Sequence, residues 1–174
     1  MQIVNGFIEL RIFIVNTDFP LLKTYVKNLW TMVKKSEDLV DIYLTNNGGS
    51  GDILKIRNSS VRYKKLIFSS NGINIFHFQK SVKTDMDISN YIKTSIRKKR
   101  KTYFLSTGSK LEVGKIEVFN KKYYTVCVEA LDITDFVFLC NKIGIANLLP
   151  AAIRDSNNQI INGYNQFIAY LSLS

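Results

Sequence analysis

The chain has 174 residues, of which 46% are apolar and 12% aromatic, and it carries a formal net charge of +10. This length and composition exclude an intrinsically disordered protein and predict one folded domain over residues 1–174. No apolar run approaches the roughly 18 residues of a membrane span, and no secretory signal is recognisable, so we expect an intracellular protein that is neither secreted nor membrane-spanning.

Two elements are expected in the N-terminal part. The stretch 7–15, FIELRIFIV, alternates apolar side chains with the polar Glu9 and Arg11, which predicts a strand. Residues 17–35 repeat apolar side chains every three or four positions behind a capping Thr17 or Asp18. This spacing predicts an amphipathic helix.

The middle of the chain predicts short strands followed by a second helix. Between residues 39 and 79, apolar stretches alternate with turn signals such as NNGGSG and SSNG, which predicts an antiparallel meander. In the stretch 84–100, TDMDISNYIKTSIRKKR, the residues Ile88, Ile92 and Ile96 recur at helical spacing. We therefore expect a helix that ends in basic residues.

Further strands and a third helix complete the expected fold. Three stretches between residues 101 and 130 predict strands, and residues 132–144 predict a helix that Asp132 caps and Gly144 ends. The order of elements predicts an α+β fold. It would be a single domain with a mostly antiparallel sheet of meanders and hairpins and about three helices packed on one face.

The segment 145–174 is nearly uncharged, since Arg154 and Asp155 are its only charged residues. Chain ends are normally solvated and mobile, so a long apolar one is unusual. Two interpretations stay open. The segment either adds an element to the core or forms a docking surface for a protein partner or a second copy of the chain.

The usual sequence signatures of catalysis and metal binding are missing. Cys127 and Cys140 are far apart and His77 is the only histidine, which excludes the common zinc spacings and a local catalytic triad. No Glu or Asp stands two residues before a lysine. We therefore predict no catalytic residue, no metal site and no cofactor. An enzyme whose carboxylates come from distant positions stays open as an alternative.

The strongest local feature is the basic run RKKRK, Arg97 to Lys101. Residues 93–122 contain ten basic residues against Glu112 and Glu117, and so supply +8 of the +10 net charge. The abundance of Ile, Lys and Asn is typical of an AT-rich genome, but codon bias does not explain this clustering. Contact with a polyanion, a solvated helix end and a nuclear-import signal are the three interpretations.

The favoured function is that of a non-catalytic, basic nucleic-acid-binding protein, a subunit of a larger assembly. It would contact RNA or single-stranded DNA mainly through the phosphate backbone, with tyrosines stacking on bases. An alternative is a small viral or phage-type accessory or inhibitory protein that docks on an acidic protein. A third is a metal-dependent enzyme. The predicted nucleic-acid-binding residues are Arg97, Lys98, Lys99, Arg100, Lys101, Tyr103, Lys121, Lys122 and Tyr123.

Overall fold

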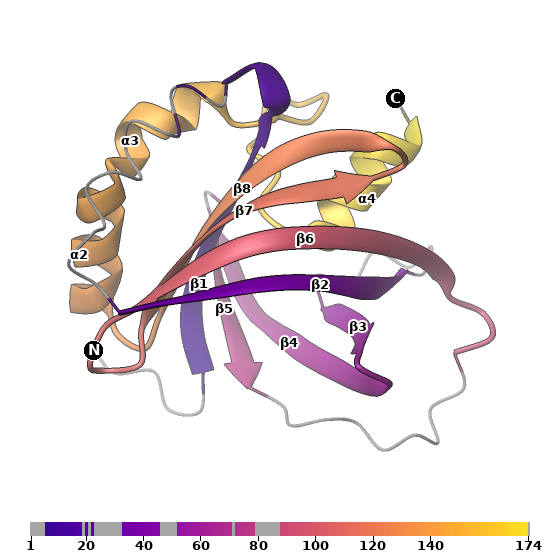
Figure 1. The fold of residues 1–174 in the computed structure, drawn as a ribbon, viewed down its shortest axis with the longest axis horizontal. Coiled ribbons are helices and arrows are strands. Elements are labelled where there is room, and N and C mark those ends of the chain that lie inside the picture. The colour runs from indigo at the N-terminus through magenta and orange to yellow at the C-terminus, as the bar shows by residue number, and fades with distance from the viewer. Residues whose placement is uncertain are drawn as a thin grey trace.

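Eight antiparallel strands form a closed barrel in the spatial order β1-β5-β4-β3-β2-β6-β7-β8 (Figure 1). The computed structural model describes residues 6–18, 20, 22, 33–45, 52–70, 72–78 and 88–173. The strands are β1 Gly6–Val15, β2 Val33–Thr45, β3 Ile53–Arg57, β4 Ser60–Ser70, β5 Ile73–Phe78, β6 Ile92–Phe104, β7 Lys110–Val118 and β8 Lys121–Ala130. The described helices are η1 Asn16–Asp18, α2 Ile133–Ile143, α3 Ile145–Leu148, η3 Leu149–Ala151 and α4 Tyr164–Leu173.

Tight turns join several neighbouring strands, as the meander pattern predicts. The β3–β4 turn holds Asn58 and Ser59 at φ 49° and 59°, and the β7–β8 turn holds Phe119 and Asn120 at the same two angles. Two consecutive left-handed residues match the twist of the strands that they connect. Gly72, at φ 81°, supplies the left-handed position between β4 and β5.

Strand β1 closes the barrel because it pairs on both sides. Glu9 lies opposite Asn74 of β5 and opposite Glu129 of β8. The expectation of an α+β fold with three helices on one face of a sheet is therefore wrong. The sheet closes into a barrel, and the helices among the described residues are few and short. The alternation of Glu9 and Arg11 with apolar neighbours cannot distinguish a solvated face from a polar barrel interior, because both give the same pattern.

The helix predicted over residues 84–100 is also wrong. Strand β6 begins at Ile92 and pairs with β2 along its whole length. Its burial alternates, with Ile96, Lys98 and Thr102 buried and their neighbours Arg97 and Lys99 exposed. Because basic residues occupy both faces, the sequence hides the two-residue period. The rest of the predicted stretch, residues 84–87, lies outside the described residues.

The helix expected over residues 17–35 is wrong at its end, since Val33 to Lys35 belong to β2. Most of its length, residues 19, 21 and 23–32, lies outside the described residues. The third predicted helix is confirmed as α2. The Asp132 side chain accepts a hydrogen bond from the Asp135 backbone, and Gly144 ends the helix at φ 65°.

Helices α2 and α3 pack on the outside of the barrel (Figure 1). Phe136, Leu139 and Leu148 meet the outward side chains of β1 and β8, such as Ile12 and Val126, in one hydrophobic cluster. Among the described residues, no single helix is long and apolar enough to cross a membrane. The bent pair Ile133–Ile143 and Ile145–Ala151 meets that length and composition test jointly, with a bend of 57°.

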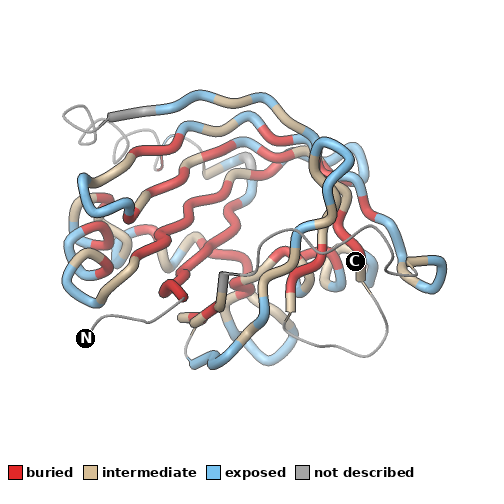
Figure 2. Tube along the Cα trace, turned by 90° about the horizontal axis from the view of Figure 1, so that it is seen from below, coloured by how far each residue is buried: buried red, intermediate tan, exposed pale blue. Residues whose placement is uncertain are grey.

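Helix α4 closes one end of the barrel. Phe167 stacks on Phe13 of β1 at a centroid distance of 4.1 Å and meets Tyr123 of β8 edge to face at 5.0 Å. These rings belong to a second hydrophobic cluster that also contains Ile96 and Ile116. Figure 2 shows the buried stretches of the strands along the barrel. Of the two interpretations of segment 145–174, the packing of α4 supports a core element, and the docking surface stays a prediction.

Candidate active site

The inner face of the barrel carries a cluster of ionised side chains. Among the described residues, ion pairs inside the barrel join seven basic side chains to five carboxylates, which we call the interior charge cluster. Each carboxylate has two or three cationic partners. Buried charges are costly unless they are paired, so an excess of cations indicates a site for an anion. The members are Arg11, Lys55, Arg57, Lys64, Lys98, Arg100 and Lys110 with Glu9, Glu37, Asp41, Glu112 and Glu129.

Three cations surround Asp41 of β2, whose side chain is fully buried. Lys55 Nζ lies 3.2 Å and Lys98 Nζ 2.9 Å from Asp41 Oδ2. Arg57 donates two hydrogen bonds, at 2.5 and 2.6 Å, to the two carboxylate oxygens. Burial raises the pKa of this carboxyl, but Arg57 and Lys98 outweigh it and hold the pKa far below its usual range. Asp41 is therefore an anion held by the Arg57 guanidinium and by the amino groups of two lysines.

Arg11 of β1 lies at the centre of a second group. Its Nε donates to Glu9 Oε1 at 3.3 Å and its Nη1 donates to Glu112 Oε1 at 3.0 Å. Arg100 binds the other oxygen of Glu112. Burial raises the pKa of the Glu112 carboxyl, but Arg11 and Arg100 reverse the shift and lower the pKa to about 2.

Glu9 and Glu129 lie opposite each other across the β1–β8 junction and share a lysine. Lys64 Nζ, from β4, is 2.8 Å from Glu9 Oε2 and 3.4 Å from Glu129 Oε1. Lys110 Nζ lies 2.8 Å from Glu129 Oε2. Burial raises the pKa of Glu129, but these two lysines lower it below its usual range. The Glu129 carboxylate is thus ionised, and cationic side chains already contact both carboxylates.

Two lysines of the cluster are poor cations in this setting. Burial lowers the pKa of Lys55 to about 8, although Asp41 opposes the shift. Burial and the nearby charge of Lys55 lower the pKa of Lys98 well below its usual value. A lowered lysine pKa means that the nearby negative charge is too small to offset the cost of burying the ammonium group. A bound anion would supply it.

The charges lie toward one end of the barrel and the aromatic side chains toward the other. Helix α4 covers the end where β7 finishes and β8 begins, beside Tyr123. A cavity of about 950 Å³ lies at the opposite end, where β2 and β7 begin. Arg57, Arg100, Lys110 and Glu112 of the charge cluster line this cavity. The barrel interior is therefore reached from the end remote from α4.

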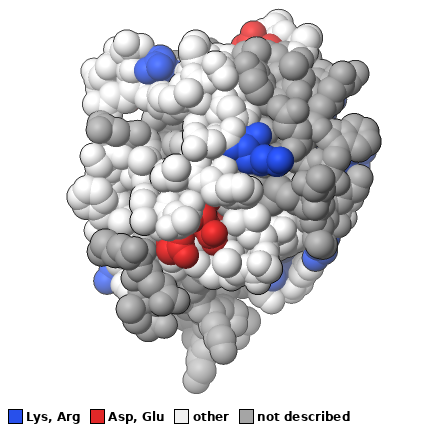
Figure 3. Space-filling model, turned by 90° about the vertical axis from the view of Figure 1, so that its left-hand side faces the viewer, with Lys and Arg blue, Asp and Glu red and all other residues white. Residues whose placement is uncertain are grey.

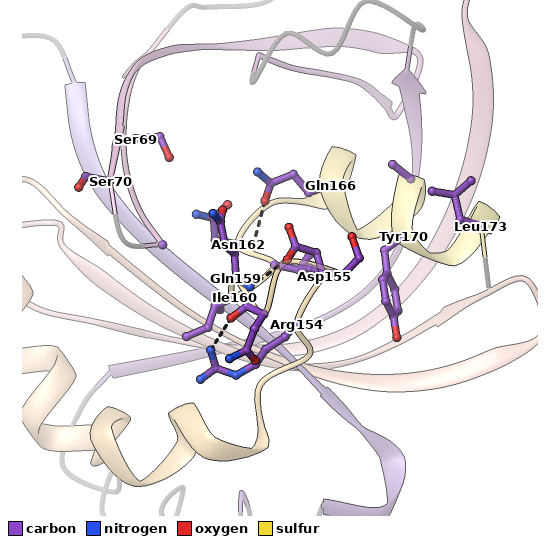
Figure 4. Close-up of a pocket in the computed structure, with 15 residues that line it drawn as sticks. Ser69, Ser70, Arg154, Asp155, Gln159, Ile160, Asn162, Gln166, Tyr170 and Leu173 are labelled. Atoms are coloured by element: carbon purple, nitrogen blue, oxygen red, sulfur yellow. Dashed lines mark hydrogen bonds between the residues drawn. The ribbon is translucent and has the colours of Figure 1, made fainter.

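A second hollow lies outside the barrel, between α4, the β4–β5 turn and the loop before α4 (Figure 4). Several of its polar groups are hydrogen-bonded to one another. Arg154 donates to the Asn158 carbonyl oxygen at 3.0 Å, and the Asn162 backbone donates to Gln166 Oε1 at 3.2 Å. Arg154 and Asp155 are the charged residues among its lining. Without an excess of either charge, this hollow lacks the anion-binding character of the interior charge cluster.

The structure divides the predicted nucleic-acid-binding residues between two environments. Lys98 and Arg100 lie inside the barrel, whereas Arg97, Lys99 and Lys101 are exposed on its outer face.

Lys121 and Lys122 are exposed at the start of β8. A phosphate-contact role for the exposed basic residues stays a prediction.

The two predicted stacking tyrosines are buried. Tyr103 is 5% exposed and belongs to the cluster under α2, and Tyr123 is 8% exposed inside the barrel. Stacking on a base requires an exposed ring, which Tyr123 does not offer, since its side chain lies on the opposite face of β8 from Val126 and Val128. The face of β8 that carries Tyr123 lines the barrel interior.

On the α2 and α3 side of the molecule, few charged side chains are visible among the described residues (Figure 3).

The carboxylates fit a divalent cation that brings further ligands with it. Ligand atoms of Glu9, Cys127 and Glu129 lie within 4.8 Å of one another. Burial raises the pKa of Cys127, so its sulfur is a neutral thiol and a weak ligand. Mg²⁺ and Mn²⁺ prefer oxygen and commonly use one or two carboxylates together with water and substrate phosphates. Glu9 and Glu129 supply such oxygens, provided that Lys64 moves aside.

Several solved structures share this fold. A Hippeastrum protein, named as a candidate adenylyl cyclase and described as having a dominant triphosphatase activity, is 12% identical over 97% of this chain and 96% of its own, with a TM-score of 0.62. The RNA triphosphatase domain of a mimivirus mRNA capping enzyme is 15% identical over 81% and 89%, with a TM-score of 0.56. A candidate adenylate cyclase from Bacillus halodurans is 9% identical over 88% and 96%, with a TM-score of 0.52. At these identities, the likeness shows the fold alone.

No protein-family model matches the chain, and no curated protein matches it by sequence. The shared barrel and the converging carboxylates nevertheless contradict the prediction of a non-catalytic, basic nucleic-acid-binding protein. They also give no support to an accessory or inhibitory protein, since the activities named for these similar structures are enzymatic. The condition for the third alternative is met, because Glu9, Asp41 and Glu112 come from distant strands into one interior.

Proposed function

We propose that the barrel interior binds the triphosphate group of a substrate and hydrolyses one of its phosphoanhydride bonds. The observation that carries this proposal is the excess of cations over carboxylates in the interior charge cluster. A triphosphate is a linear chain of negative oxygens, and a row of Lys and Arg side chains matches it in charge and shape. The triphosphatase activities named for proteins of the same fold support this choice of anion.

The basic side chains bind and orient the phosphate chain. Arg57, Arg100 and Lys110 line the cavity at the open end, and Lys55 and Lys98 lie deeper beside Asp41. Phosphoryl transfer passes through a loose transition state, so positioning and charge stabilisation supply most of the catalysis. Fixed cations in a water-poor interior provide both, because they do not have to reorganise during the reaction.

The carboxylates have a separate role. Glu9 and Glu129 would hold a divalent metal, which in such sites neutralises phosphate oxygens and lowers the pKa of a bound water. Glu112 holds Arg11 and Arg100 in place through its two oxygens. The low pKa of Glu112 makes it a weak general base, so we assign it to positioning. The thiol of Cys127 is neutral and buried and takes no part as a nucleophile.

The test is phosphate release from tripolyphosphate, ATP and a 5′-triphosphorylated RNA, each with Mg²⁺ or Mn²⁺. The paired variants Lys98→Met/Arg100→Met and Lys99→Met/Lys101→Met remove the same charge from the inner and outer face of β6. We expect the inner pair to lower the rate by about 100-fold or more and the outer pair to leave it within about twofold. Equal losses in both variants, or no phosphate release from any substrate, would contradict the proposal.

A further inference from the structure

The first residue of α4, Tyr164, reaches from the closed end of the barrel into the interior charge cluster. It is 3% exposed. Its ring centroid lies 4.5 Å from that of Tyr43 and 5.2 Å from that of Phe13. Lys98 Nζ is 3.7 Å from the ring centroid and Arg11 Cζ is 4.8 Å from it. The ring therefore borders both the aromatic cluster and two of the buried cations.

The hydroxyl group of Tyr164 is buried and has no hydrogen-bond partner among the described residues. This is costly, because a buried polar group has lost its water and gained nothing in return. The neighbouring Tyr43 shows the ordinary arrangement, since Lys98 Nζ donates to its hydroxyl at 2.7 Å. An unpartnered hydrogen-bond donor beside an excess of basic side chains indicates a site for an anion.

Burial raises the pKa of Tyr164, and although Arg11 opposes the shift, the phenol stays protonated at neutral pH. Its O–H group is thus available as a donor. A carbonyl or carboxylate could accept from it, but no such acceptor is placed there within the described residues. A phosphate oxygen is an acceptor that the surrounding cations would themselves attract.

We infer that the Tyr164 hydroxyl donates a hydrogen bond to the innermost phosphate of the bound chain, alongside Lys98 and Arg11. The inference deepens the proposed function and rests on it. Because α4 covers this end of the barrel, the phosphate chain enters from the other end and reaches Tyr164 with its terminal group first. Tyr164 is then a substrate-binding residue contributed by the C-terminal helix and not by a barrel strand.

The test is Tyr164→Phe, which keeps the ring and removes only the hydroxyl. Its matched control is Tyr170→Phe, the same change on the same helix at a half-buried ring beside the outer hollow. Tripolyphosphate binding is measured by titration calorimetry, and thermal unfolding is followed without ligand. We expect Tyr164→Phe to weaken binding by roughly tenfold or more while raising the melting temperature of the ligand-free protein. Tyr170→Phe should leave the affinity unchanged.

The two readouts move in opposite directions, which separates a ligand contact from a packing effect. If Tyr164→Phe stabilises the free protein but binds tripolyphosphate like the wild type, the hydroxyl faces a buried water or nothing, and the inference is wrong. If the wild type itself does not bind tripolyphosphate, the proposed function fails and the inference falls with it. A tyrosine absorbance change on adding tripolyphosphate, present in wild type and Tyr170→Phe but absent in Tyr164→Phe, would support the contact independently.

Discussion

Lys98 and Lys99 are adjacent in the sequence, yet the barrel wall separates their ammonium groups. The Lys98 side chain is 3% exposed and lies 2.9 Å from Asp41, whereas the Lys99 side chain is 66% exposed and lies 3.5 Å from Asp38. Successive side chains of a strand point to opposite faces, so one basic run serves two surfaces. This relationship supplies matched pairs of variants for most of the tests below.

Replacing Lys98 by Met should stabilise the protein. Its lowered pKa shows that the fold disfavours the charged form, and Asp41 keeps Lys55 and Arg57 as partners after the change. The change also leaves the Tyr43 hydroxyl without its donor, so we expect the free energy of unfolding in urea to rise by at most about 1 kcal/mol at neutral pH. Lys99→Met should stay within about 0.5 kcal/mol, as exposed ion pairs contribute little. A loss of stability in Lys98→Met would show that Lys98 is needed as a counter-ion.

The opposite result is expected for Asp41→Asn. This change leaves three buried cations without their shared anion, and breaking such a group typically costs about 3–5 kcal/mol. Added tripolyphosphate should restore part of the loss, because it replaces the missing negative charge. Asp38→Asn, on the outer face of the same strand with its side chain 49% exposed, is the control and should change stability little. Failure of tripolyphosphate to raise the melting temperature of Asp41→Asn would argue against an anion site here.

Tripolyphosphate affinity should fall as the pH rises through about 8. The pKa of Lys55 is lowered to about 8, so its ammonium is charged below that pH and neutral above it. The charged form attracts the phosphate chain, and the ligand's own ionisation acts in the opposite direction over this range. Calorimetry between pH 7 and pH 9 measures the trend, and Lys55→Met should abolish the part due to this lysine. The same pH dependence of affinity in the wild type and in Lys55→Met would exclude Lys55 as a contact.

Removing Lys64 should expose the two carboxylates that we propose as metal ligands, Glu9 and Glu129. Its ammonium lies between Glu9 and Glu129, where a divalent cation would have to bind. We expect Lys64→Met to bind Mn²⁺ about tenfold more tightly, measured by calorimetry without substrate. Lys65→Met is the control, since Lys65 is exposed on the other face of β4. Unchanged Mn²⁺ affinity in Lys64→Met would place the metal elsewhere.

The close contact of β7 with β6 at Gly114 predicts a packing defect. A Cβ atom at this position would lie 3.1 Å from Arg100 Cβ and 3.2 Å from the Lys99 carbonyl oxygen. Gly114→Ala should therefore lower the free energy of unfolding by about 1–3 kcal/mol. Gly163→Ala is the comparison, because nothing lies within 4 Å of a Cβ there. If the two variants were equally stable, β6 and β7 would have to move apart at Gly114 without a loss of stability, and the predicted packing defect would be wrong.

The predictable parts of the fold are those in which apolar and polar residues alternate or helix signals coincide. The strand over residues 7–15 and the helix capped by Asp132 and ended by Gly144 were both open to prediction for this reason. Strand β6 was not, because Lys98 and Arg100 face inward and their basic neighbours outward. The period of two is lost when both faces are charged.

The candidate site was harder to predict than the fold. Arg100 stood among the predicted residues, but as a contact on an exposed surface and not as a partner of Glu112. Ionisable residues two apart in a strand, such as Glu9 with Arg11, were the available signal, since one face of such a strand is charged. Arg11 pairs with Glu112, 101 positions away, and Glu9 pairs with Lys64, 55 positions away. Only the closure of the barrel brings them together.

Closure of the barrel also has a consequence for the rate of folding. Strand β1 pairs with β8, so residues such as Leu10 must find partners such as Val128 from the far part of the chain. Proteins dominated by such distant pairings fold slowly. That pairing also places the buried side chains of Arg11 and Glu129 side by side in the interior. We therefore expect the ligand-free protein to refold slowly for its size, because the closure that builds the charged interior depends on contacts between distant parts of the chain.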